Sequence, residues 1–225
     1  MLRSRPGGSD LAVTPKELAE REGKPIAIAW IDAATRALRD YDTWLAGGVE
    51  PATRALVASA LATAFSLSPN ADPRELREYV ADILETFARS REILVRSDRW
   101  FVGVTEQAAR NVFGGAADIP PAYAIYDEAI YFTPRFAPWD PATRRGFGPL
   151  CRAAMVLHES VHVVDPRSGE SEVHVSEWDE PRFSAQTPDQ SVHNPSSYAC
   201  FAAQVHTGAI EWPRAARFGA GRPAD

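Results

Sequence analysis

The stretch Val156–Asp165, VLHESVHVVD, contains two histidines separated by three residues, with a glutamate directly after the first. Residues four apart lie on one face of an α-helix, so His158 and His162 can offer two imidazoles to one metal ion. Glu159 lies one step round the helix, where it can take a proton from a water molecule that the ion activates. The spacing therefore predicts a zinc site with Glu159 as general base.

The residues around this stretch predict a helix from about 148 to 164 with two distinct faces. One face carries an apolar stripe of the kind that packs against a protein core, and another carries the two histidines. All five histidines of the chain lie between 158 and 206, which favours a shared site over scattered surface positions. The apolar stripe is Leu150, Ala153, Leu157, Val161 and Val164, and the histidine face is Cys151, Met155, His158, His162 and Asp165.

The residues that follow His162 do not match two common classes of zinc peptidase. The metzincin pattern places a glycine and a histidine where this chain has Asp165 and Ser168, and no methionine follows Met155 to form a Met-turn. A thermolysin-like site needs a glutamate on a downstream helix, but Glu177 precedes a proline in a stretch with loop composition. The third ligand therefore has to come from a different arrangement.

A third class fits better, because residues 98–207 resemble the aspzincins, the family of deuterolysin and peptidyl-Lys metallopeptidases. The resemblance rests on AIYDEAIYFTPRF (124–136) before the helix, on HESVH within it, and on HNPSSYACFAAQ (193–204) after it. It implies a zinc-dependent peptidase with a zincin-like fold. It also implies that Tyr198, in the closing motif, donates a hydrogen bond to the developing oxyanion.

The loop between these motifs departs from the family pattern. Aspzincins carry Gly-Thr-x-Asp-x-x-Tyr there, whereas this chain reads EVHVSEWDEPRF (172–183). His174 is the preferred third ligand, because His174-x-x-Glu177 keeps the family spacing and places a ligand-type residue first. Glu177 and Asp179 are the alternative ligands, and Glu177 beside a ligating His174 would orient its ring.

The remaining sequence predicts an α+β fold. Pro-initiated helices with capping residues fill the first part of the chain, and β-prone runs follow it. The predicted domains are a helical N-terminal region (1–95), a zincin-like metallopeptidase domain with a small mixed sheet (96–210) and a C-terminal tail (211–225). The predicted elements are a first helix capped by Thr14, helices at 25–46 and 51–67, a helix after Asp72, a strand at 99–104, a strand or hairpin at 123–132, a loop at 165–186, and a last helix from Asn194 to about 207.

Composition narrows the classes of function. The 225 residues carry a formal net charge of -6, which argues against nucleic acid or an anionic membrane as partner. No apolar run is long enough to span a bilayer, and no signal peptide is visible after the basic N-terminus. The chain is thus expected to be cytoplasmic or exported by a non-classical system. Cys151 and Cys200 are expected to be reduced core residues.

Two hypotheses of function follow. The first is a zinc metallopeptidase that hydrolyses a peptide or protein substrate. The second is a catalytically inactive zincin-like binding module or secreted effector, which would present the N-terminal helices to a protein partner.

Overall fold

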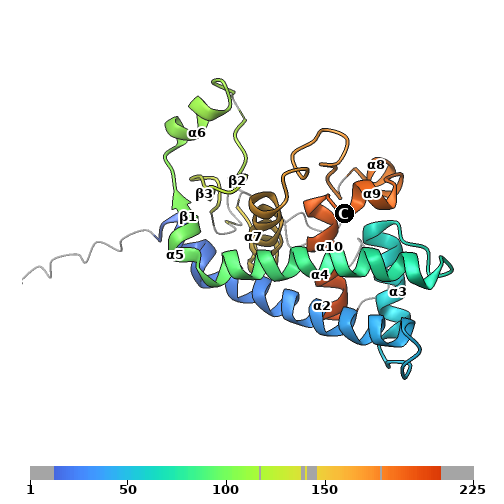
Figure 1. Cartoon of the computed structure of the whole chain (residues 1–225). Helices are drawn as coiled ribbons and strands as arrows, with labels where there is room; N and C mark the ends of the chain where they lie inside the picture. Colours follow the sequence, from blue (N-terminus) through green and yellow to red (C-terminus); the bar gives the residue numbers. More distant parts are fainter. Residues whose placement is uncertain (1–12, 117, 138–139, 141–145, 178, 209–225) are drawn as a thin grey trace, which may run out of the picture.

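The computed structural model describes residues 13–116, 118–137, 140, 146–177 and 179–208, and it has a mixed α+β fold, as predicted. Two long helices lie side by side along one side of the molecule, and a small sheet lies near one end of the histidine-bearing helix (Figure 1). The predicted C-terminal tail lies outside the described residues.

The first part of the chain is helical, as predicted. The Thr14 hydroxyl accepts a hydrogen bond from the backbone of Glu17, whose carboxylate accepts one from the backbone of Thr14. Asp72 caps α4 by accepting from the backbone of Arg74. A π-helical turn, η1, joins α1 to α2 without a break. The bounds are α1 Pro15–Leu18, η1 Ala19–Gly23, α2 Lys24–Leu45, α3 Arg54–Phe65 and α4 Pro73–Val95.

A three-stranded mixed sheet follows these helices. Strand β3 is central, with β1 parallel to it on one side and β2 antiparallel on the other. Strands β2 and β3 form the predicted hairpin, and Asp127 in its turn has a positive φ of 52°. Strand β2 is therefore an edge strand. The bounds are α5 Ser97–Trp100, β1 Phe101–Gly103, α6 Glu106–Val112, β2 Ala122–Ile125 and β3 Ala129–Phe132.

Three elements differ from the prediction in length or kind. The helix predicted for 51–67 ends at Phe65, because Ser66 adopts the left-handed conformation with φ 56°. The strand predicted for 99–104 begins only at Phe101, since α5 occupies the preceding turn. The loop predicted for 165–186 includes a short helix, α8 (Glu180–Ser184). Its proline, a loop signal in the sequence, stands in the first helical turn, where a missing N–H costs nothing.

The histidine-bearing helix, α7 (Pro149–Val164), lies at the centre of the fold. It packs against η1, α2, α4 and α10 and also against β2 and β3. Leu150 of the predicted core stripe is 49% exposed, whereas Cys151, Arg152 and Ala153 of the same turn are buried. The chain then continues through α9 (Pro188–Ser191) to α10 (Pro195–Thr207), the predicted last helix.

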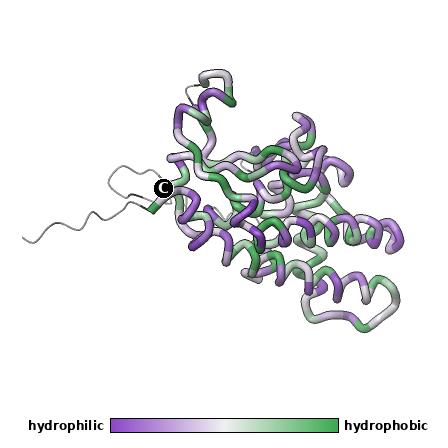
Figure 2. Tube along the Cα trace, turned by 60° about the vertical axis from the view of Figure 1, so that its left-hand side comes forward, coloured by the Kyte–Doolittle hydropathy of each residue, from purple (hydrophilic) through white to green (hydrophobic). Residues whose placement is uncertain are grey.

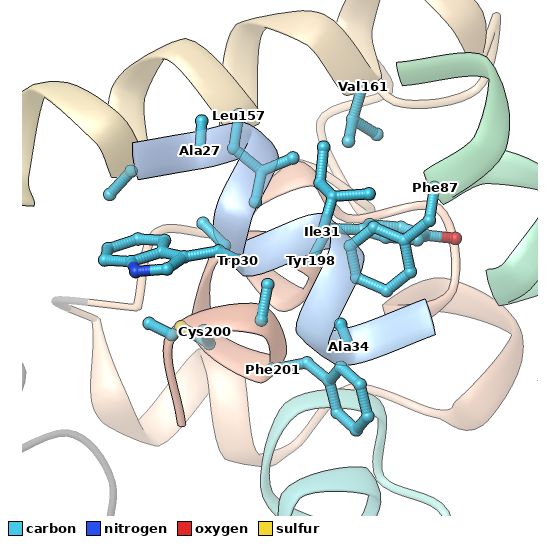
Figure 3. Close-up of a cluster of buried hydrophobic side chains, with 14 of the residues drawn as sticks. Ala27, Trp30, Ile31, Ala34, Phe87, Leu157, Val161, Tyr198, Cys200 and Phe201 are labelled. Carbon is cyan, nitrogen blue, oxygen red and sulfur yellow. The ribbon is translucent and has the colours of Figure 1, made fainter. Parts of the chain in front are cut away.

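Both predicted regions of the chain contribute to one hydrophobic core. Trp30 and Ile31 of α2 meet Phe87 of α4, Leu157 of α7 and Phe201 of α10 in a single buried cluster (Figure 3). Hydrophobic and hydrophilic residues alternate along the helical turns, as expected for amphipathic helices that share a core (Figure 2). Helices from both sides of residue 95 thus pack together, and the division predicted there separates two stretches of sequence that share one core.

Gly23 allows η1 to approach α7 closely. A Cβ atom at this position would lie 2.9 Å from Val156 Cγ2 and 3.1 Å from the carbonyl oxygen of Arg152. Such contacts are shorter than carbon atoms tolerate, so a larger residue would push the two helices apart. This close approach holds η1 against the turn of α7 that contains Arg152 and Val156.

Candidate metal centre

Three histidines come together at α7. His158 and His162 lie one turn apart on this helix, and His174 reaches them from the loop that follows. One ligand nitrogen from each residue lies within 4.8 Å of the other two. The structure thus brings His174 to the helical pair, close enough for the three residues to hold a metal ion.

The closest pair of nitrogens has the spacing of two ligands on one small ion. His158 Nε2 lies 3.2 Å from His174 Nε2. Two nitrogens bound tetrahedrally to zinc at about 2.0–2.1 Å lie about 3.3 Å apart. Three imidazoles also match the donor preference of zinc, because neutral histidine nitrogens are among its commonest ligands. The residues present therefore fit a zinc ion.

Ser168 fixes which nitrogen of His162 carries the proton. Ser168 Oγ donates its only hydrogen to the carbonyl oxygen of Asp165 at 2.6 Å, and it lies 2.9 Å from His162 Nδ1. The serine oxygen must therefore accept a hydrogen bond from His162 Nδ1–H. This tautomer leaves the lone pair of His162 Nε2 free for a metal ion, the usual arrangement for a ligand histidine.

The three imidazoles are held in their neutral form. Burial lowers the pKa of His158 well below its usual value, and the charges of His162 and His174 lower it further. Burial also lowers the pKa of His162 to about 3, with His174 adding to the effect, and burial lowers the pKa of His174. Metal binding requires unprotonated nitrogens, so these histidines can bind near neutral pH without first losing a proton.

Glu159 faces the open edge of the sheet. Its side chain is buried, with 9% of its surface exposed, and burial raises its pKa to about 8 against the opposing effect of a backbone hydrogen bond with Ala124. Directly before β2, the carbonyl oxygen of Pro121 accepts a hydrogen bond from Thr133 N and so points toward the neighbouring chain of β3. Backbone groups alternate in direction along a strand, so those of Ala122 and Ala124 point away from β3. The carboxyl group therefore lies beside the edge of β2 that pairs with no other strand of the described sheet.

Two of the predicted ligand candidates lie apart from the histidines. Among the described residues, the group that could hold a metal contains no carboxylate. The charge of Glu177 instead acts on Cys151 and Cys200, and it adds to the burial that raises the pKa of both thiols. Asp179 forms a salt bridge with Arg182 at 3.6 Å. His174 is thus the candidate third ligand that the fold brings to the site.

Tyr198, the predicted oxyanion donor, is a core residue in this structure. Its ring is fully buried between Phe65 and Phe87, with T-shaped contacts to both. Its hydroxyl donates to the carbonyl oxygen of Val192 at 2.6 Å. Helix α10 is buried on all its faces from Pro195 to Gln204, and this side chain packs into the core from it.

Sequence reasoning missed the residues that support the histidines. Ser168 stands six positions after His162, and no local pattern links a serine in a loop to an imidazole in the preceding helix. On α10, Ser196 Oγ lies 3.4 Å from His158 Nδ1, a contact between residues 38 positions apart. Asn194 donates a hydrogen bond to the carbonyl oxygen of Val175, next to His174, but its sequence context indicates only a helix cap. Such partners depend on the folded path of the chain, so a single sequence carries little signal for them.

Comparison of this chain with protein-family models, with curated proteins and with solved structures finds no match. None of the helices in the described part of the chain is both long and apolar enough to cross a bilayer. The resemblance to the aspzincins therefore rests on the sequence motifs alone.

Proposed function

We propose that this chain is a zinc-dependent metallopeptidase of the zincin type, with an aspzincin-like arrangement of motifs. The observation that carries the proposal is the convergence of His158, His162 and His174 beside Glu159. Zinc bound by three protein ligands lowers the pKa of a water molecule to about 7 and polarises a carbonyl group. All three proposed ligands are histidines, and His174 takes the role of third ligand that an aspartate has in the aspzincins.

The number of protein ligands in the group supports a catalytic site over a structural one. Structural zinc sites have four protein ligands, whereas catalytic sites keep one position for water and substrate. Within the part of the chain that the structure describes, only three side chains of ligand type form the group. A fourth ligand from the protein would have favoured a zincin-like module without activity.

In this proposal Glu159 acts as general base. It follows His158 on the helix, so it lies next to the ligands without being one of them. Its carboxylate takes the proton of the attacking water and passes it to the leaving amine. The unpaired edge of β2 lies beside it and can bind an extended peptide through backbone hydrogen bonds. Peptides and unstructured protein segments are therefore the proposed substrates.

The test is cleavage of a mixed peptide library, followed by mass spectrometry, with zinc-loaded protein. Glu159→Gln is expected to lower the rate by about 100- to 10,000-fold, the usual contribution of a general base, while zinc content stays the same. Glu172→Gln, the same change at an exposed position of the following loop, is the matched control and is expected to cleave at the wild-type rate.

Equal cleavage by wild type and Glu159→Gln would contradict the proposed mechanism. Zinc binding without any cleavage by the wild type would instead favour the alternative of a zincin-like binding module.

A further inference from the structure

The loop that carries His174 is anchored on both sides of this residue. Val173 and Val175 are buried, while the imidazole between them lies outside the hydrophobic core. The carbonyl oxygen of Val173 accepts a hydrogen bond from Gln186 Nε2 at 2.7 Å, and that of Val175 accepts one from Asn194 Nδ2 at 2.8 Å. Side chains from later in the chain thus fix the backbone directly before His174 and one residue after it.

The two amide side chains also bind each other. Asn194 Nδ2 donates to Gln186 Oε1 at 2.7 Å, and Asn194 Oδ1 accepts from the backbone of Ser196 as the cap of α10. These bonds use both ends of each amide, so only one orientation of each side chain satisfies them. Asn194 is fully buried and Gln186 is 6% exposed, so little water competes for the bonds.

We propose that Gln186 and Asn194, together the loop clamp, are positioning residues for His174 as third metal ligand. This inference rests on the proposed function, because it assigns the clamp to the same zinc site. The loop has no helix or strand at His174, and its regular hydrogen bonds there are limited to one turn from Glu170. The clamp holds the backbone around His174 in place, as the helix backbone does for His158 and His162. Since Asn194 is the cap of α10, the position of α10 sets the distance of His174 from α7.

The test measures zinc affinity by competition with a chelator, and coordination geometry from the visible absorption of the cobalt-substituted protein. Asn194→Ser keeps an oxygen that can cap α10 but removes the donor to Val175. Gln186→Met keeps the length of the side chain and removes both hydrogen bonds. Each is expected to weaken zinc binding about 10- to 100-fold, the usual effect of a residue that orients a ligand.

Asp72→Ala is the matched control, since it removes the cap of a helix that contributes no residue to the loop. It is expected to lower thermal stability without changing zinc affinity or the cobalt spectrum. In the His174→Ala background, only the weaker affinity of His158 and His162 for zinc is left to measure. Asn194→Ser is expected to cause no further loss there, because the ligand that it positions is gone.

Unchanged affinity in both folded clamp variants would overturn the inference, and so would the same loss from Asn194→Ser when His174 is already absent. These outcomes are distinct from a failure of the proposed function. If the wild type bound no zinc, the metal site and the clamp would both be contradicted, whereas tight zinc binding with unchanged clamp variants contradicts the clamp alone.

Discussion

Helix α7 and the loop after it reach the same histidine cluster by different physical means. In α7 the 3.6-residue period places His158 and His162 on one face, and backbone hydrogen bonds within the helix keep them there. His174 comes from a segment without regular structure, so its place depends on side chains far along the chain. The position of a ligand on a helix thus depends on residues close to it in the sequence. The position of a ligand on a loop depends on the distant side chains that hold the loop.

A large effect on zinc affinity is expected at Ser168, which orients a helical histidine. Ser168→Ala removes the acceptor of His162 Nδ1–H and is expected to weaken zinc binding about 10- to 100-fold, as loss of such partners usually does. The exposed Ser171→Ala in the same loop is the matched control and is expected to bind zinc like the wild type. Chelator competition measures both variants.

Wild-type affinity in Ser168→Ala would mean that the helix alone orients His162. The difference between α7 and the loop would then be larger than we infer, since only His174 would need support from other side chains.

A small effect is expected at Tyr198, which belongs to the core. Tyr198→Phe removes one buried hydrogen bond to the carbonyl oxygen of Val192 and is expected to cost about 1 kcal/mol of stability. In a chain of this size, that corresponds to a fall of about 2–4 °C in Tm. The kcat for peptide cleavage is expected to stay the same. A fall in kcat of a hundredfold with unchanged zinc content would restore Tyr198 as oxyanion donor.

Local patterns in the sequence predicted the parts of this fold that depend on short-range physics. Thr14 and Asp72 mark helix starts, the run before and after Asp127 marks a hairpin, and the spacing of His158 and His162 marks a shared helix face. Each of these signals lies within a few residues of the element that it defines, so a single sequence contains the whole pattern.

The long-range parts of the site could not be predicted in the same way. His174 was preferred on spacing, with Glu177 and Asp179 left open, because nothing local decides which side chain of a loop turns back to the helix. Tyr198 lies in a motif that resembles a catalytic one, but the packing of Phe65 and Phe87 around its ring decides its role. Tertiary contacts of this kind override what a motif suggests.

The decisive measurement is the metal content of the purified protein, determined by elemental analysis. The variants to compare with the wild type are His174→Ala, Glu177→Ala and Asp179→Ala. We predict about one zinc per chain in the wild type and in both carboxylate variants, and loss of zinc in His174→Ala alone, as for a site of three histidines. A wild type without zinc even after reconstitution, or full zinc content in His174→Ala, would contradict the account.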